Sequence, residues 1–442
     1  MSLRYFHLLA CCFVFGLVAI PCAAQDTQTL SLADAEKIAI ANHPQIQAAG
    51  YLAAAAKAQV TQARSAFYPQ AFGSLTGAEA EHDSRIAAGA LNNPIIYDRY
   101  SNGVTVEQLV TDFGRTRELA KSANLHAQAQ QESVTTSRAD ALLNVDRAFY
   151  GVLRAQAVLK VAEETVKNRQ LVSDQVTELE RNKLKSGLDV SFANVDLAQA
   201  QLLLIQAQNG VQASYADLSA ALGYEQERTF ALAEEAVPPA PPPNISDLIA
   251  QALRDRPELI SRRLDVRSAQ SYATAERDLW FPTISATGAA GLTPVREEPL
   301  GARYAAAGFN VNIPLFNGHQ FGALRAEANS EAQAQQQFLR DVQNGVVRDV
   351  RKAWLDAKAE FQRLAVTDQL LSQATQALDL AQQRYKLGLS SIIELSQAQL
   401  NMTQAEITQT SSKYDYETAI AALNYQVGAG TPDPTVPTPQ KR

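Results

Sequence analysis

The side chains that most often carry chemistry are sparse in this sequence. Beyond the N-terminal segment there are four histidines, none with the spacing of a metal site: His43, His82, His126 and His319. Neither the GxSxG turn of serine hydrolases nor the phosphate-binding GxxxxGK loop occurs. Asp112-Phe113-Gly114 spells the magnesium-binding triplet of protein kinases, but every companion motif is missing. We therefore predict that the protein is not an enzyme and uses no metal ion or other cofactor.

The first 24 residues have the features of a signal peptide. They contain one basic residue, an apolar run too short to span a membrane, and a small residue, Ala24, at the expected cleavage site. All cysteines of the chain lie in this segment: Cys11, Cys12 and Cys22. Acylation of Cys22 is the less favoured alternative, because that reaction prefers a small residue where this chain has Pro21. The mature chain then has no thiol, which for an exported protein favours the bacterial envelope.

The charge of the chain also limits its partners. The formal net charge is -7, and it becomes -8 when the signal peptide is removed together with Arg4. An acidic chain is a poor partner for nucleic acid. No later segment has the 18 or so consecutive apolar residues of a membrane helix, so any contact with a membrane is expected through strands.

The mature chain repeats itself, as prolines, the phrase ANLHAQAQQ and glycines show. Pro44 and Pro69 match Pro257 and Pro282 at an offset of 213 residues. The phrase that begins at Ala123 returns at Ala328, an offset of 205, and Gly187 matches Gly388 at an offset of 201. We predict two structural repeats, residues 25–237 and 244–428. A stiff proline linker, 238–243, joins them, and a disordered proline-rich tail, 429–442, follows.

Both halves have the same predicted elements. A helix begins near Ser31 or Ser246 and is interrupted before Pro44 or Pro257. β-Hairpins then occupy about 69–110 and 282–315, where apolar and polar residues alternate. Long helices follow, about 113–183 and 318–387, whose apolar residues recur every seven positions as in a coiled coil. Each is about 100 Å long at 1.5 Å per residue, and a glycine turn and a return helix complete each half.

These elements predict a mainly α fold with a small β part: two long coiled-coil hairpins and two β-hairpins. The return helix and the pre-strand helix, placed end to end, nearly match the length of one long helix. Four strands cannot close a membrane barrel, which needs about eight or more, so several chains would have to share it. Aromatic residues at the helix–strand junctions fit either local packing or a membrane interface.

Several motifs together resemble the TolC-type outer-membrane efflux and secretion channels. They are ARSAFYPQ (63–70) with ERDLWFPT (276–283), LVTDFGR (109–115) with IPLFNGH (313–319), and the turns KSGLDV and KLGLSS. The resemblance implies a homotrimer with a shared 12-stranded transmembrane β-barrel in outer-membrane lipid and a trimeric α-barrel tunnel through the periplasm of a Gram-negative cell. It also implies a periplasmic adaptor and an inner-membrane transporter as partners. Drug efflux and type I protein secretion both remain open.

The resemblance also implies roles for residues near the helical turns. Adaptor tips would dock at Ser186, Gly187, Leu188, Leu387, Gly388 and Leu389. Glu394 and Gln397 occupy the two positions of the pore constriction, where the family has acids and this chain keeps only the first. Tyr385 occupies the position of a gate tyrosine, but its acidic partner is replaced by Ala193, so the tyrosine would pack there or bond to Asp189 or Asp196.

The alternative is a periplasmic coiled-coil scaffold or adaptor that never spans the outer membrane. An adaptor, however, would have one helical hairpin between soluble β-domains, whereas this sequence has two hairpins with strands of alternating polarity.

Overall fold

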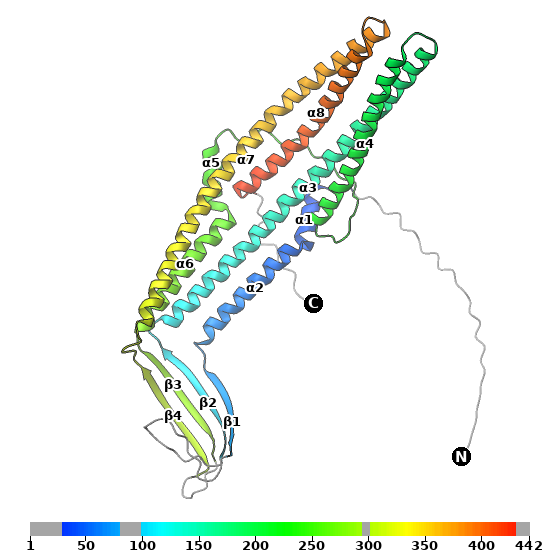
Figure 1. Cartoon of the computed structure of the whole chain (residues 1–442). Helices are drawn as coiled ribbons and strands as arrows, with labels where there is room; N and C mark the ends of the chain where they lie inside the picture. The colour runs from blue at the N-terminus through cyan, green and yellow to red at the C-terminus, as the bar shows by residue number, and fades with distance from the viewer. Residues whose placement is uncertain (1–28, 80–98, 294–300, 430–442) are drawn as a thin grey trace, which may run out of the picture.

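The computed structural model describes residues 29–79, 99–293 and 301–429. The signal peptide and nearly all of the predicted tail lie outside the described residues. The molecule is elongated, with a β-sheet at one end and two helical turns at the other (Figure 1). Its helices are much more extensive than its strands, as predicted.

The two halves contain the same elements in the same order. The first half has α1 (Leu32–Asn42), α2 (Pro44–Ser65), β1 (Gln70–Ala78), β2 (Arg99–Thr111), α3 (Arg115–Arg181) and α4 (Gly187–Ala221). The second has α5 (Ile245–Asp255), α6 (Pro257–Arg277), the short helix η1 (Asp278–Trp280), β3 (Thr283–Leu292), β4 (Arg303–Asn312), α7 (Gln320–Lys386) and α8 (Ile392–Val427).

Local signals account for most of these boundaries. Ser31 caps α1, its side chain accepting a hydrogen bond from the backbone N–H of Asp34. His43 and Arg256, which precede the prolines, have ψ of 122° and 124° and interrupt the helices as expected. The predicted helix start near Ser246 is confirmed, since α5 begins at Ile245 and its cap Asn244 accepts a hydrogen bond from the N–H of Ser246.

The structure corrects the repeat register at the helical turns. Lys183 and Gly388 both have positive φ, 62° and 74°, and they are 205 residues apart. Both N–H groups bond three residues back, Lys183 to the carbonyl of Glu180 and Gly388 to that of Tyr385. The caps Ser186 and Ser391 have the same spacing. The glycine pairing at 201 was therefore wrong: Gly187 is simply the first residue of α4, and the repeat keeps one spacing after the strands.

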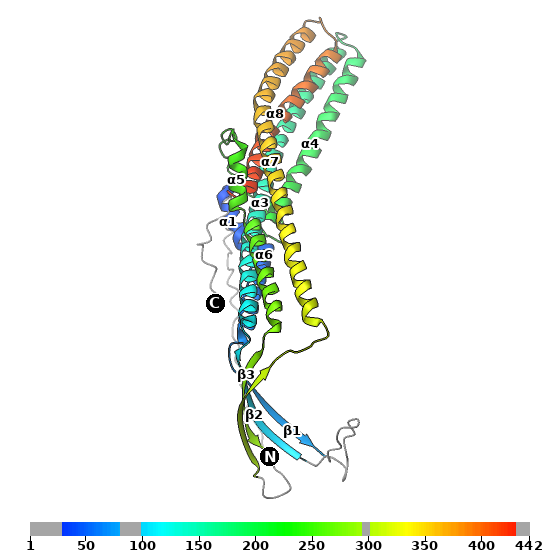
Figure 2. The ribbon, with the colours of Figure 1, turned by 90° about the vertical axis from the view of Figure 1, so that its left-hand side faces the viewer.

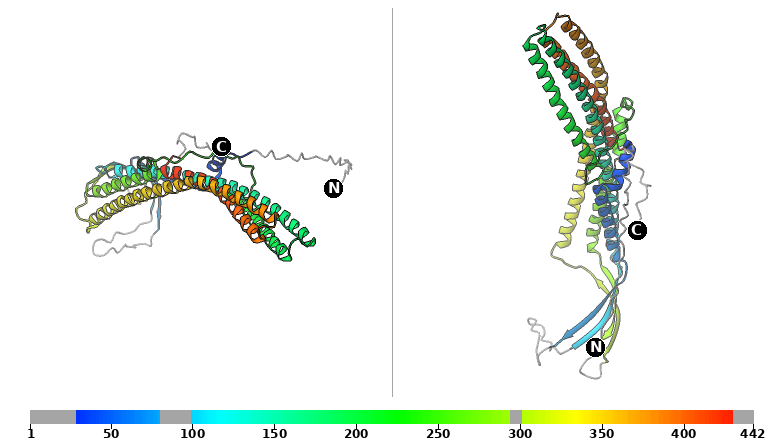
Figure 3. Two further views of the ribbon diagram at one scale, coloured as in Figure 1. Left: turned by 90° about the horizontal axis from the view of Figure 1, so that it is seen from above. Right: turned by 90° about the vertical axis from the view of Figure 1, so that its right-hand side faces the viewer.

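The helices form one curved layer, which Figure 3 shows from above. The long helices α3 and α7 have 67 residues each. The short helices α6 and α8 both contact α3 and α7, and α2 and α4 pack against α3. With 22 residues in α2 and 35 in α4, the two nearly match the length of α3, as predicted.

Buried apolar residues occupy equivalent places in the two halves. Val145 and Val350 are fully buried at the middle of the long helices, and Ala39 and Ala252 pack beside them from the first helix of each half. Further along α7, Ala357 and Tyr385 of the predicted seven-residue seam are buried as well. Leu364, Leu371 and Leu378 between them are only partly buried, so the predicted coiled-coil seam forms part of the interior of the layer.

One helix has the composition of a membrane span. Among the described residues, only α4 is both long and apolar enough, with a mean hydropathy of 1.2 over 18 residues. Leu188, Val195 and Leu202 recur along it every seven residues and are exposed. The sequence contains no uninterrupted apolar run of 18 residues in this helix, which is why no membrane helix was predicted there.

The return helices end against the proline breaks of the first helices. Gly223, which follows α4, has φ of +80°, and a Cβ there would lie 3.0 Å from the backbone of Asn42. Gly428 after α8 has the same φ and lies beside Asp255 and Arg256. Both glycines permit a left-handed turn that other residues adopt at a cost.

We expect Gly223→Ala to lower the free energy of unfolding by about 1–2 kcal/mol or more, because alanine disfavours this φ and its Cβ would press on Asn42. The control is Gly210→Ala within α4, where nothing lies within 4 Å of the added Cβ and alanine favours the helix. Thermal unfolding midpoints of the purified protein measure the difference. Equal midpoints for the two variants would contradict this account.

Candidate functional site

The four strands form one antiparallel sheet in the order β1-β2-β3-β4. Figure 2 shows that this sheet is curved. Its two edge strands, β1 and β4, belong to different repeats, and the outer edge of each pairs with no other strand in the described part of the chain. Unpaired strand edges expose backbone N–H and C=O groups that require other partners.

The register of the ladder gathers apolar residues on one face of the sheet. Directly paired residues lie on the same face, and the row Ala71, Val106, Gly288 and Ala307 runs across all four strands. The next row on this face contains Gly73, Val104, Ala290 and Ala305. The two-residue alternation predicted for the segments of β2, β3 and β4 is therefore in phase across the whole sheet.

The opposite face of the sheet is mainly polar. One row across it contains Gln70, Glu107, Thr287 and Gly308, and β4 adds Asn310 opposite Ser285. A curved sheet with one apolar and one polar face suits a wall between lipid and water.

Aromatic side chains lie at the end of this sheet that joins the helices. Part of their surface packs locally, as where the rings of Phe113 and Phe281 lie 6.0 Å apart. Even so, the aromatic residues at the junctions remain exposed: Phe67, Tyr68, Phe113, Trp280, Phe281 and Phe316. Local packing thus accounts for only part of their surface, and the membrane-interface interpretation stays open.

At the opposite end of the molecule, the predicted docking residues lie on the two helical turns. Ser186 caps α4 in a reciprocal arrangement with Asp189, and Gly187 begins the helix. Leu188, Leu387 and Leu389 are 65%, 73% and 66% exposed. The register correction shows that the glycines are not equivalent, although both turns present apolar side chains to solvent.

Two further exposed residues on these turns were missed by sequence reasoning. Leu184 is equivalent to Leu389, and Ile393 is equivalent to Leu188, when the 205-residue spacing is kept through the turn. The pairing of Gly187 with Gly388 concealed them. The true signal was the shared serine cap, followed three residues later by an acid, in SGLD and SIIE.

The proposed constriction residues are both exposed on the first turns of α8. Glu394 forms an ion pair with Arg384 of α7, with 3.0 Å between Oε1 and Nε. Gln397 donates a hydrogen bond to Asn401 one turn further along α8. The charge that Glu394 presents to the solvent is therefore partly balanced, which the sequence did not predict.

Tyr385 is held by packing in this structure. Its ring lies in an apolar cluster with Val176, Ala193 and Leu395 that joins both helical hairpins. Its buried hydroxyl has no hydrogen-bond partner. The suggestion that Asp189 or Asp196 replaces the family's acid was therefore wrong, and Ala193 contributes to packing instead.

Other contacts join the two hairpins near their turns. Ser396 of α8 donates a hydrogen bond of 2.5 Å to the Asp196 carboxylate of α4. The ammonium group of Lys185 lies 3.9 Å from the centre of the Tyr385 ring, which is a cation–π distance. The described residues contain no group of three or more acidic, histidine or cysteine side chains that could hold a metal ion.

The comparisons with known proteins agree with the geometry of both ends. Residues 37–224 and 248–429 match the family described as outer membrane efflux protein. This match covers most of the chain and includes both repeats. The chain therefore belongs to the outer membrane efflux protein family, whose members are transport channels.

Individual relatives show how widely the similarity extends. The chain is 24% identical to the outer membrane protein TolC of Vibrio cholerae over 90% of both chains. It is 23% identical to the alkaline protease secretion protein AprF of Pseudomonas aeruginosa, covering 91% of this chain and 85% of AprF. In fold it resembles the CmeC outer membrane channel of Campylobacter jejuni, with a TM-score of 0.77, 16% identity and coverage of 90% and 86%.

The Ser396–Asp196 hydrogen bond ties α8 of one hairpin to α4 of the other near the turns. We therefore expect Ser396→Ala to raise the fraction of time that the channel is open by about tenfold, because a hydrogen bond to a charged group contributes about 1.5–3 kcal/mol. Ser191→Ala is the matched control, since its hydroxyl bonds within α4 to the carbonyl of Gly187. Single-channel recordings in planar bilayers measure the open fraction. If both variants matched the unmodified protein, the Ser396–Asp196 bond would have no role in closure.

Opposite effects on ion selectivity are expected from the two members of the Glu394–Arg384 pair. Glu394→Ala should lower the ratio of cation to anion permeability, and Arg384→Ala should raise it, because each removes one sign of charge near the turn. Reversal potentials in a salt gradient give this ratio. Unchanged potentials in both variants would reject a place for this pair at the constriction.

Proposed function

We propose that three copies of this chain form an outer-membrane channel that exports substrates from a Gram-negative cell. The observation that carries the proposal is the sheet, which has one apolar face, one polar face and two open edges. Within hydrocarbon, unpaired strand edges are not tolerated, so such a sheet must be closed by further strands. Three copies of four strands would provide a 12-stranded barrel, which is within the range of known membrane barrels.

The helical layer supports the same arrangement through its repeat. Within one chain, α3 of the first half contacts α6 of the second. Ser122 and Ser268 form part of this joint, each hydroxyl donating to the other's backbone carbonyl. By the spacings of 205 and 213, the equivalent residues are Glu327 on α7 and Ala55 on α2, and both are exposed.

A neighbouring copy would cover these exposed surfaces. Its α2 would pack on α7 as α6 packs on α3, and its α4 would bring the stripe of Leu188, Val195 and Leu202 against the upper part of α7. Phe338 and Leu355 are exposed on α7 and would be covered in the same joint. Closure by three such joints gives a tunnel of helices that continues the barrel.

The exposed leucines on the helical turns support a periplasmic adaptor as a partner. Apolar side chains that protrude from a turn are suited to anchoring a partner. The adaptor would in turn connect the tunnel to an inner-membrane transporter. The similarity to AprF favours protein secretion no more than the similarity to TolC favours efflux, so the proposal covers both classes of cargo.

We expect the double variant Ala55→Cys/Glu327→Cys to form disulfides between copies, because the equivalent serines within the chain have oxygens 3.0 Å apart. The mature chain has no other cysteine to interfere. Non-reducing electrophoresis should show covalent dimers and trimers but nothing larger. Each single variant is the control and should yield no trimer. A double variant that remains monomeric would contradict the proposed joint.

A further inference from the structure

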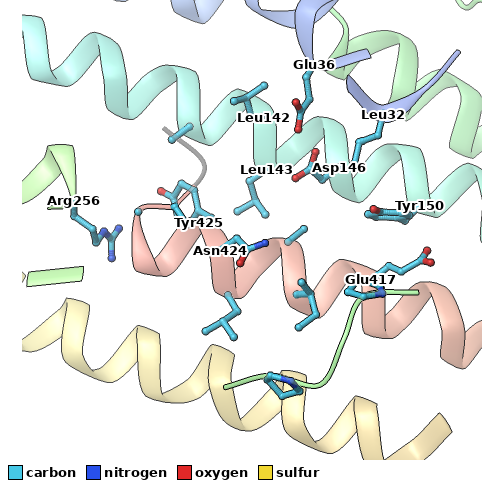
Figure 4. Close-up of a pocket in the computed structure, with 18 of the residues that line it drawn as sticks. Leu32, Glu36, Leu142, Leu143, Asp146, Tyr150, Arg256, Glu417, Asn424 and Tyr425 are labelled. Atoms are coloured by element: carbon cyan, nitrogen blue, oxygen red, sulfur yellow. The ribbon is translucent and has the colours of Figure 1, made fainter. Parts of the chain in front are cut away.

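A cavity of about 590 Å³ is drawn in close-up in Figure 4. The helices that line it meet near the middle of the molecule, away from both the sheet and the helical turns (Figure 1). Helices α1, α3 and α8 line it, together with the proline linker 238–242. None of the roles proposed for the channel uses this cavity.

Four carboxyl groups line the cavity, and three of them, on α1, α3 and α8, lie away from the Arg256–Glu258 ion pair. In Figure 4 the carboxyl groups of Glu36 on α1 and Asp146 on α3 point toward one another. Glu417 on α8 is only 2% exposed, and one of its oxygens has no hydrogen-bond partner. One oxygen of Asp146 is also buried without a partner. Glu36 and Asp146 hydrogen-bond to one another, which requires that they share a proton. Buried carboxylates normally have a cation or several hydrogen bonds, so the oxygens of Asp146 and Glu417 that lack a partner leave this arrangement incomplete.

The nearby charged groups do not balance these acids. Lys413 of α8 acts electrostatically on Glu417, but its ammonium group pairs with Glu234 at 3.0 Å. Glu235 of the connecting segment adds further negative charge close to Asp146 and Glu417. At the other end of the cavity, Arg256 pairs with Glu258 and donates to Gln426.

Burial and this excess of acids act on the protonation of the cluster. Burial, with Glu36 and Glu235 nearby, raises the pKa of Asp146 to about 7. Burial also raises the pKa of Glu417 to about 7. In mildly acidic solution both groups are therefore protonated, and at pH 8 the cavity becomes strongly negative.

The walls between the carboxyl groups are apolar and aromatic. Leu32, Leu142 and Leu143 line the cavity, and the ring of Tyr150 lies within reach of the charges on both Asp146 and Glu417. Methylene groups suit such walls, and ammonium groups suit carboxylates beside aromatic rings. A bare metal ion fits poorly, because the cavity is large and the described residues hold no preformed group of three metal ligands.

We propose that this cavity binds an aliphatic diamine or polyamine, with one ammonium group at Glu36 and Asp146 and another at Glu417. Bound in this way, the ligand would connect α1, α3 and α8 at the middle of the helical layer. Protons and the amine would compete for the same carboxylates, so binding should strengthen as the pH rises.

Isothermal titration calorimetry tests this proposal. Spermidine is titrated into the purified full-length protein in detergent at pH 6 and at pH 8. Affinity should be at least about tenfold higher at pH 8. Asp146→Asn and Glu417→Gln should each weaken binding at pH 8 by a similar factor. Glu227→Gln is the matched control, since this exposed carboxylate lies on the segment that follows α4, and its affinity should not change.

Three outcomes would overturn the proposal. The first is the absence of any heat of binding at pH 8. The second is equal spermidine affinity in the Asp146→Asn, Glu417→Gln and Glu227→Gln proteins. The third is that Mg²⁺, at equal ionic strength, competes with spermidine as effectively as putrescine does. If the Asp146→Asn or the Glu417→Gln protein failed to fold, thermal unfolding of the unmodified protein would test the site instead. Spermidine should then raise its midpoint at pH 8 but not at pH 6, and an equal or absent shift at both would reject the site. These readouts do not depend on channel activity.

Discussion

The unpaired backbone N–H and C=O groups at the two open edges of the sheet are the constraint on which the proposed channel depends. Water can satisfy the edge groups of β1 and β4, but hydrocarbon cannot. The ladder gathers Val104, Val106 and Ala286 on an apolar face, so the sheet is suited to lipid only when other strands cover its edges. Closure by further copies would satisfy both requirements.

The duplication explains how one chain could supply several of the helices that would form the wall of a tunnel. Each half has a 67-residue helix and three shorter α-helices, and left-handed glycines, Gly223 and Gly428, lie where the return helices meet the breaks between the first two. In the proposed trimer, the joint between α3 and α6 within the chain would be the template for the joint between copies. The opening turns of α3 and α7, where ANLHAQAQQ and ANSEAQAQQ lie, therefore combine small residues for close packing with amides that tolerate water.

Sequence reasoning was most successful where a local rule decides the structure. The prolines at 44 and 257 interrupt the helices, period-two patterns define the strands, and the seven-residue seam is buried. It was less successful at the turns, where a shared glycine seemed a better guide than the serine caps at 186 and 391. The partner of Glu394 and the isolation of the Tyr385 hydroxyl depend on contacts between α7, α8 and α4, which no single-sequence pattern encodes.

The most direct test of the central claim is how the mature protein leaves the outer-membrane fraction. A sheet that forms part of a closed barrel in lipid predicts that carbonate and high-salt washes leave the protein in the membrane and that only detergent extracts it. Release of the protein by carbonate or salt alone would contradict the account and favour a periplasmic coiled-coil scaffold.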